Sequence, residues 1–151
     1  DILDNIIISA GDNADNSYSK KAYHGVHVFT NDGKNNFKEG YFYPAYGATK
    51  TLARDFDGDG DLDLAMIAFF PENDKGVNES FLYFQNQGKL RFQVSNLNLP
   101  DDARYMAMDA GDFDKDGDID LLLGNFQFGK PKPGVKLTPG LQLRLLRNSI
   151  H

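Results

Sequence analysis

Hydrophobic residues fall in short runs along this 151-residue chain, and the stretches between the runs are rich in glycine, asparagine and aspartate. Residues 63–70 and 120–126 are apolar on both faces and have the length of strands rather than helices, which predicts two fully buried strands. Shorter apolar runs at 51–54 and 106–110 precede them. The pattern therefore predicts an all-β fold in which each short run forms a hairpin with the buried run that follows.

Two further segments have the pattern of hairpins and resemble each other. Residues 28–37 match residues 83–92, and both contain an Asn-x-Gly sequence, at Asn31 to Gly33 and at Asn86 to Gly88. Asparagine and glycine accept the positive φ angles that tight turns require. We expect each segment to be two antiparallel strands joined at this turn.

The turn of each buried hairpin is an aspartate-rich loop with the sequence DxDxDGxxDL. The first loop spans Asp55–Leu64 and the second spans Asp112–Leu121. Carboxylates at positions one, three, five and nine converge on one point, because the glycine at position six allows a sharp turn; hard oxygen ligands in this number suit calcium. The candidate carboxylate ligands are Asp55, Asp57, Asp59 and Asp63 in the first loop, and Asp112, Asp114, Asp116 and Asp120 in the second.

Electrostatics favours a cation in these loops over a merely solvated turn. Two carboxylates ~4 Å apart repel by roughly 4 kcal/mol at an effective dielectric near 20. The loops hold ten of the 22 acidic residues, and two bound Ca²⁺ ions would change the formal charge from −6 to −2. An EF-hand is excluded because position twelve, which must be glutamate, is Met66 in one copy and Leu123 in the other.

The loops are part of a longer internal repeat with an offset of 57 residues. Residues 3–9 align with 62–68, so that Asp4 corresponds to Asp63, and residues 145–148 align with 83–86. Each unit reads as four antiparallel strands, which is one blade of a β-propeller. The repeats occupy roughly 1–46, 47–102 and 103–151, or about two and a half blades.

These repeats resemble the FG-GAP or VCBS type, which builds the calcium-bearing, seven-bladed propellers of integrin α subunits and of many secreted bacterial proteins. The resemblance rests on the DxDxDGxxDL loop, the apolar strand after it and the Asn-x-Gly hairpin. It implies two calcium sites with the aspartates named above as ligands. It also implies that the backbone carbonyls of Asp61 and Asp118 are ligands at position seven.

Composition narrows the setting of such a protein. The chain has 40% hydrophobic residues, ample for a packed core, and no cysteine, which excludes disulfides and thiolate zinc sites. Calcium loops favour an extracellular, cell-surface or periplasmic location, where the ion is plentiful. The sequence pI near 4.9 and the absence of a basic stripe argue against nucleic acid as a partner, and no apolar run has the ~20 residues of a membrane span.

The resemblance implies a non-enzymatic scaffold with a role in cell adhesion, whose ligand or partner binds opposite the metals. Variable loops at 12–23, 71–80 and 127–139 would lie on that face, and the candidate ligand-binding residues are Tyr43, Tyr46, Arg104 and Tyr105. Packing in an outer strand is the alternative for Tyr43. The alternative functions are a propeller module of a secreted carbohydrate-active or redox-associated enzyme, or a structural spacer.

Two and a half blades cannot close a ring, since propellers need about four to eight. We expect the chain to be a piece of a longer protein; the alternative is a small natural chain that completes its ring by oligomerising. Its partners would be the remaining blades of a longer polypeptide or copies of itself, besides a protein or carbohydrate ligand. Leu143 and Leu145, in the strand expected at 141–147, should pack against strands that this chain does not supply.

Overall fold

The computed structural model describes residues 5–11, 21–71, 77–97, 99, 103–126 and 142–150. These residues form ten β-strands, and none of them is helical. The strands are β1 (Ile6–Ala10), β2 (Gly25–Asn31), β3 (Phe37–Pro44), β4 (Ala48–Arg54), β5 (Asp63–Ala68), β6 (Phe81–Asn86), β7 (Phe92–Asn96), β8 (Tyr105–Gly111), β9 (Asp120–Asn125) and β10 (Leu143–Leu146).

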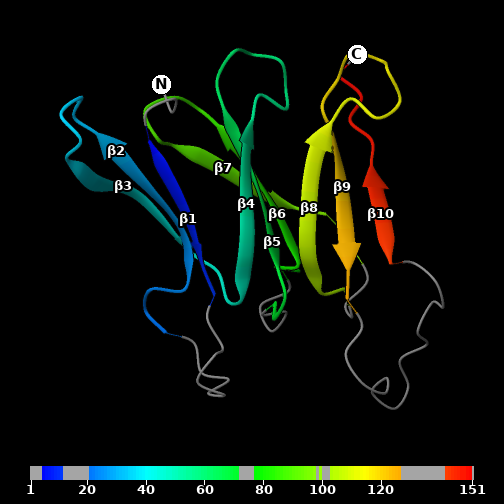
Figure 1. Cartoon of the computed structure of the whole chain (residues 1–151), viewed down its shortest axis with the longest axis horizontal. Coiled ribbons are helices and arrows are strands. Elements are labelled where there is room, and N and C mark those ends of the chain that lie inside the picture. Colours follow the sequence, from blue (N-terminus) through cyan, green and yellow to red (C-terminus); the bar gives the residue numbers. More distant parts are fainter. Residues whose placement is uncertain are drawn as a thin grey trace.

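The strands form three antiparallel sheets that stand side by side (Figure 1). The middle sheet has the order β4-β5-β6-β7, the first has β1-β2-β3 and the third has β10-β9-β8. In the middle sheet each strand is hydrogen-bonded to its neighbours in sequence, which is the meander of a propeller blade. The predicted all-β fold of propeller blades is therefore confirmed.

Strand register shows which parts of a blade the flanking sheets contain. Ile6 of β1 pairs with Phe29, just as Leu64 of β5 pairs with Phe84, so β1, β2 and β3 correspond to β5, β6 and β7. Leu146 of β10 pairs with Leu121 in the same way, so β8, β9 and β10 correspond to β4, β5 and β6. The described part of the chain thus holds one four-stranded blade between two three-stranded partial blades.

The same register corrects the alignment of the N-terminal repeat. Because Ile6 corresponds to Leu64, the residue that corresponds to Asp63 is Asn5, and the expected match of Asp4 to Asp63 is wrong by one residue. The error arose from matching Leu3-Asp4 to Leu62-Asp63 by residue type. A shift of one residue in a strand exchanges its two faces. In the structure Ile7, not Ile6 or Ile8, packs toward the middle sheet.

Two hydrophobic clusters hold the sheets together. Val26 and Val28 of the first sheet pack against Leu64, Met66 and other residues on one face of the middle sheet. The opposite face of that sheet packs on the third sheet in a second cluster, which consists of Phe56, Ala65, Ile67, Phe81, Leu99, Ala103, Tyr105, Met108, Leu121 and Leu123. All six residues of β5 are buried, as its two-sided apolar pattern predicts.

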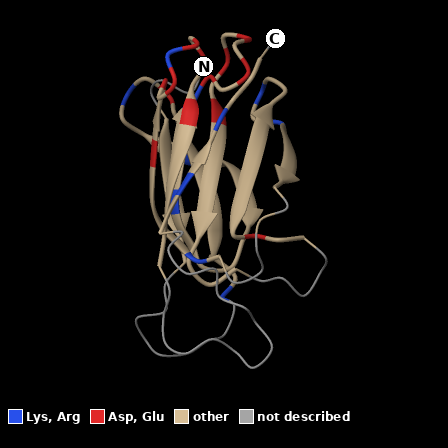
Figure 2. Ribbon diagram, turned by 90° about the vertical axis from the view of Figure 1, so that its right-hand side faces the viewer, with Lys and Arg blue, Asp and Glu red and all other residues tan. Residues whose placement is uncertain are grey.

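The aspartate loops lie together at one end of the molecule. The loop between β4 and β5 and the loop between β8 and β9 both project from the upper end of the sheets (Figure 1), and most of the acidic residues gather there (Figure 2). The residues drawn in colour include no helix of the length and apolarity needed to cross a membrane. Packed sheets thus hold the acidic loops side by side.

Phe84 tests the contact between the first and middle sheets. Its ring is fully buried and meets the ring of Tyr43 edge-on at 5.0 Å. Phe84→Ala should lower the free energy of unfolding by about 3–5 kcal/mol, because it leaves a cavity in a packed core. Phe37→Ala, at a β3 position that is 43% exposed, is the matched control and should cost under about 1 kcal/mol. Urea unfolding would measure both, and equal losses would contradict the assignment of this cluster as a core.

Candidate metal centres

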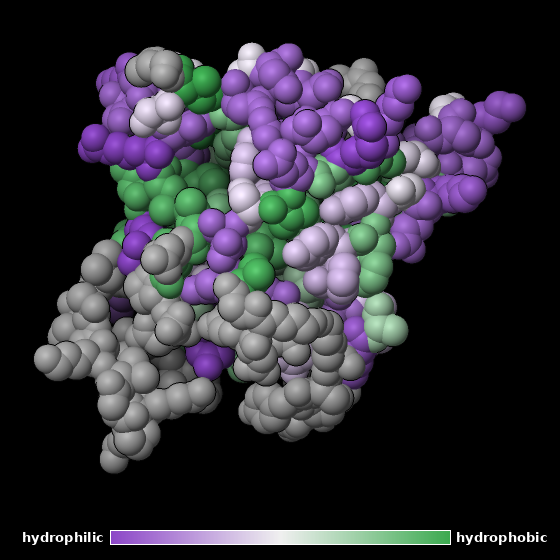
Figure 3. Space-filling view, turned by 180° about the vertical axis from the view of Figure 1, so that it is seen from behind, coloured by the Kyte–Doolittle hydropathy of each residue, from purple (hydrophilic) through white to green (hydrophobic). Residues whose placement is uncertain are grey.

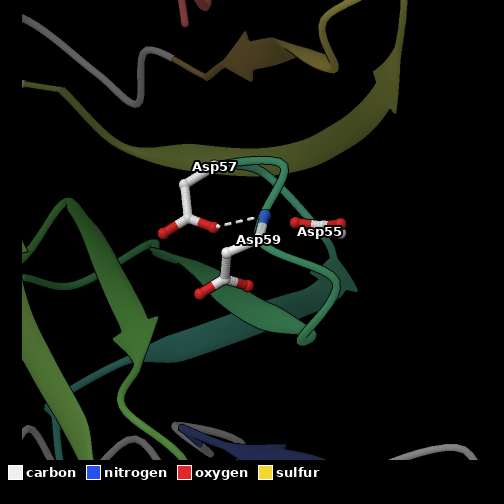
Figure 4. Close-up of side chains that lie close together, drawn as sticks. All are labelled: Asp55, Asp57 and Asp59. Atoms are coloured by element: carbon white, nitrogen blue, oxygen red, sulfur yellow. Dashed lines mark hydrogen bonds between the residues drawn. The ribbon is translucent and has the colours of Figure 1, made fainter.

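The first aspartate loop brings three carboxylates together. One oxygen from each of Asp55, Asp57 and Asp59 lies within 4.8 Å of the others (Figure 4). Backbone N–H groups of the same loop fix these carboxylates: Gly58 and Gly60 donate to the two oxygens of Asp55 at 2.8 and 3.0 Å. The loop therefore orients its acidic groups by its own backbone and points them at a common volume.

The second loop repeats this arrangement. Oxygens of Asp112, Asp114 and Asp116 again lie within 4.8 Å of one another. The backbone N–H groups of Asp116 and Gly117 donate to the two oxygens of Asp112, each at 3.1 Å. At position five, Asp59 and Asp116 accept from the N–H groups of Asp61 and Asp118 at 2.8 and 3.0 Å. Two sequences 57 residues apart thus fold into one loop geometry.

Left-handed backbone conformations shape both loops. The position-six glycines have φ angles of 93° at Gly60 and 99° at Gly117, as the sequence predicts. Position four is also left-handed, with φ of 73° at Gly58 and 66° at Lys115. A residue with a Cβ atom is strained there. The sequence did not reveal this second requirement, because lysine occupies the position in the second loop.

The aspartates at position nine, Asp63 and Asp120, have a different role in the structure from those at positions one to five. Both are fully buried, and neither belongs to the groups of three found among the described residues. One Asp63 oxygen accepts from the Phe56 N–H at 3.3 Å and from the Tyr83 hydroxyl at 2.6 Å. The other accepts from the N–H of Asn86 at 2.7 Å. Asp63 therefore joins its loop to the next hairpin.

The same link occurs in every sheet, and we call it the Asx link. The side chain of the residue at position nine accepts from the backbone N–H of an asparagine, which begins a hairpin turn in the first two sheets and follows β10 in the third. In the third sheet Asp120 accepts from Asn148 at 2.8 Å and, through its other oxygen, from Phe113 at 3.0 Å. In the first sheet the Oδ1 of Asn5 accepts from Asn31 at 3.1 Å. The sequence alignment missed the last of these because it placed Asp4 at this position.

The asparagines of the Asx links also brace the loops with their side chains. Asn86 donates from Nδ2 to the Leu62 carbonyl at 3.0 Å, and its Oδ1 accepts from Gly88 at 2.9 Å. Asn148 donates from Nδ2 to the Ile119 carbonyl at 3.3 Å and also to the carbonyl of Phe56, in the first loop. The Asn86 turn thus supports the first acidic loop, and Asn148 contacts both loops.

The carboxylates at position three meet different partners in the two loops. Gln85 donates from Nε2 to Asp57 at 2.7 Å, whereas Arg147 lies with Nε 3.6 Å from an oxygen of Asp114. Desolvation and the carboxylates of Asp116 and Asp120 raise the pKa of Asp114, and the charge of Arg147 lowers it. Sequence analysis did not select Gln85 or Arg147, although the alignment of residues 145–148 with 83–86 already placed them at one position.

The candidate ligand-binding residues are dispersed among different contacts. Tyr43 lies in β3, the outermost strand of the first sheet, and packs on Phe84, as the alternative interpretation expected. Tyr105 is buried in the cluster between the middle and third sheets. Tyr46 lies beside the ring of His24 at 5.5 Å.

Arg104 donates to the carbonyl of Phe69 at 3.1 Å and has its guanidinium over the ring of Phe70 at 5.5 Å. Arg104 and Tyr46 keep partial exposure, whereas Tyr105 does not. A ligand-binding role of these residues stays a prediction. Of the variable loops expected on this side, at 12–23, 71–80 and 127–139, residues 12–20, 72–76 and 127–139 lie outside the described residues.

A meander of four antiparallel strands with an acidic loop between its first two strands is a propeller-type repeat. Residues 55–123 match the family model of the FG-GAP-like repeat, so this part of the chain is similar to that repeat. The matched segment begins at the first aspartate of the first loop and ends in β9. No curated protein and no solved structure matches the chain.

Tyr83→Phe tests the buried end of the first loop. Removing the hydroxyl takes one of three hydrogen-bond donors from the fully buried Asp63. The free energy of unfolding should fall by about 1–3 kcal/mol, because a buried carboxylate loses a partner. Tyr23→Phe, at a ring that is 50% exposed, is the control and should change stability by no more than about 0.5 kcal/mol. Equal effects in urea unfolding would show that the Tyr83 hydroxyl contributes nothing to the loop.

Proposed function

We propose that the chain is a calcium-binding segment of a β-propeller and that it takes up two Ca²⁺ ions, one in each aspartate loop. The observation that carries this proposal is the repeated geometry: two loops each hold three carboxylate oxygens within 4.8 Å of one another. Such a group is unfavourable without a cation, because carboxylates this close to one another repel. Calcium would supply that balance and make the metal part of the fold.

The donor set suits calcium better than smaller or softer ions. It consists of carboxylates and backbone carbonyls, which are hard oxygen ligands, and it comes from a loop without His or Cys. In the first loop Asp55, Asp57 and Asp59 would hold the ion, with the Asp61 carbonyl as a further ligand. Asp63 retains acceptor capacity after its hydrogen bonds, since each carboxylate oxygen has two lone pairs. Asp112, Asp114, Asp116, Asp118 and Asp120 would do the same in the second loop.

We place this segment in an extracellular, cell-surface or periplasmic protein, where calcium is abundant enough to fill weak loop sites. The rigid sheets would then serve as a scaffold that presents a protein or carbohydrate ligand to the end opposite the metals. Tyr46 and Arg104 support this role because both are partly exposed. They lie just before strands β4 and β8, whose other ends lead into the aspartate loops.

Further blades on both sides would complete the propeller, in a ring that we take to have seven. Ile6 and Ile8 are exposed on the outer face of the first sheet, where the corresponding Leu64 and Met66 of the middle sheet are fully buried. On the third sheet Leu143 is 62% exposed, and Figure 3 shows hydrophobic surface on that side of the molecule. The outer face of the first sheet corresponds to the face of the middle sheet that packs on the first sheet, and the outer face of the third sheet corresponds to the face of the middle sheet that packs on the third.

Calcium titration tests the proposal. The calcium-free chain should take up about two ions in isothermal titration, and Asp57→Ala and Asp114→Ala should each remove one. Each substitution should also lower the melting temperature in calcium while hardly changing it in chelator, because the ion is what offsets carboxylate repulsion. Leu97→Ala, at an exposed site outside both loops, is the control and should keep both ions. Absence of uptake at millimolar calcium would refute the proposal.

Light scattering tests the outer faces. The isolated chain should have an average mass above the 16.9 kDa of one copy, because its outer faces remain apolar and uncovered. Leu145→Asp should reduce that association, whereas Leu97→Asp, also at an exposed leucine, should not. A monodisperse monomer at micromolar concentration would show that the flanking sheets need no further blades.

A further inference from the structure

Arg147 and Gln85 occupy the same place in the two metal centres and differ in charge. Arg147 follows Leu146, which pairs with Leu121, and Gln85 follows Phe84, which pairs with Leu64. Each contacts the carboxylate at position three of its loop. The amide of Gln85 is neutral, whereas the guanidinium of Arg147 always carries a positive charge. The first loop therefore has a neutral neighbour at the point where the second has a cation.

We infer that the two sites differ in calcium affinity and that Arg147 makes the second site the weaker one. This inference rests on the proposed function. A guanidinium about 6 Å from a divalent ion in water-like surroundings weakens ion binding about tenfold.

The surroundings of Arg147 support an electrostatic role rather than a role in packing. Its side chain is 68% exposed, so the pair with Asp114 lies at the surface and adds little stability of its own. Asp112, Asp114 and Asp116 of the second loop are exposed, whereas Asp55 and Asp57 of the first are partly buried. Lys115 adds a second positive charge to the second loop, where the first has Gly58. Calcium would thus fill the first site at lower concentrations than the second.

Single-site variants measure each loop alone. Asp57→Ala leaves the second loop intact and Asp114→Ala leaves the first, so isothermal titration of these two proteins gives the separate dissociation constants. The second loop should bind about tenfold more weakly. Adding Arg147→Gln to Asp57→Ala should remove most of this difference, and adding Gln85→Arg to Asp114→Ala should weaken the first loop by a similar factor. Arg144→Gln, at a position in β10, is the control and should change neither dissociation constant.

Salt provides a second readout. The effect of Arg147→Gln should shrink between 20 mM and 500 mM KCl, because salt screens exposed charges. An unchanged second-site constant in Arg147→Gln would overturn the inference. So would a difference between the sites that disappears in Lys115→Gly alone, since Lys115 would then be the cause. Two sites of equal affinity refute the inference and leave the proposed function intact, whereas no uptake by the unsubstituted chain refutes the proposed function itself.

Discussion

The buried side chain of Asp63 and its equivalents are the contacts on which the aspartate-loop end of the molecule depends. Asp63 joins the loop that follows β4 to the hairpin of β6 and β7, and hydrogen bonds from Asn86 to Leu62 and from Gln85 to Asp57 strengthen this connection. A fully buried carboxylate is costly unless several donors satisfy it, and here a backbone N–H from each side and a tyrosine hydroxyl do so. The burial that makes the link costly also makes it specific.

The three Asx links differ in the chemistry of their acceptor groups. Asn5 provides a neutral acceptor in the first sheet, Asp63 a buried carboxylate with a tyrosine hydroxyl, and Asp120 a carboxylate whose equivalent of that tyrosine is Leu145. Burial raises the pKa of Asp63, while hydrogen bonds from the backbone of Asn148 and Phe113 lower the pKa of Asp120. The backbone link is therefore common to all repeats, but the electrostatics of each loop end is not. The first repeat has asparagine at this position and keeps the connection.

Sequence analysis predicted those features that are set by local pattern. Two-sided apolar runs identified β5 and β9, and the spacing of aspartates and glycines identified both loops. It failed where the answer depends on register between strands: residues 3–9 were aligned with 62–68, which matches Asn5 to Leu64, because only the hydrogen bond from Asn31 reveals the position of Asn5. Gln85 and Arg147 were missed for the same reason, since nothing in their local sequence points to an acidic loop 28 to 33 residues away.

Tyr43 and Tyr105 pack between sheets, whereas Tyr46 and Arg104 stay partly exposed outside the hydrophobic clusters. This difference shows why a ligand-binding face is harder to predict from sequence than an aspartate loop. A metal site in a short loop is encoded by one segment, so its ligands carry their spacing with them. A binding face is assembled from several strands, and an aromatic residue near a strand end can equally well turn into the core, as Tyr105 does. Here the deciding factor is the close packing of neighbouring sheets: wherever two blades meet, aromatic rings serve as filling between them. Arg104, just outside that contact, stays partly exposed with its guanidinium above the ring of Phe70.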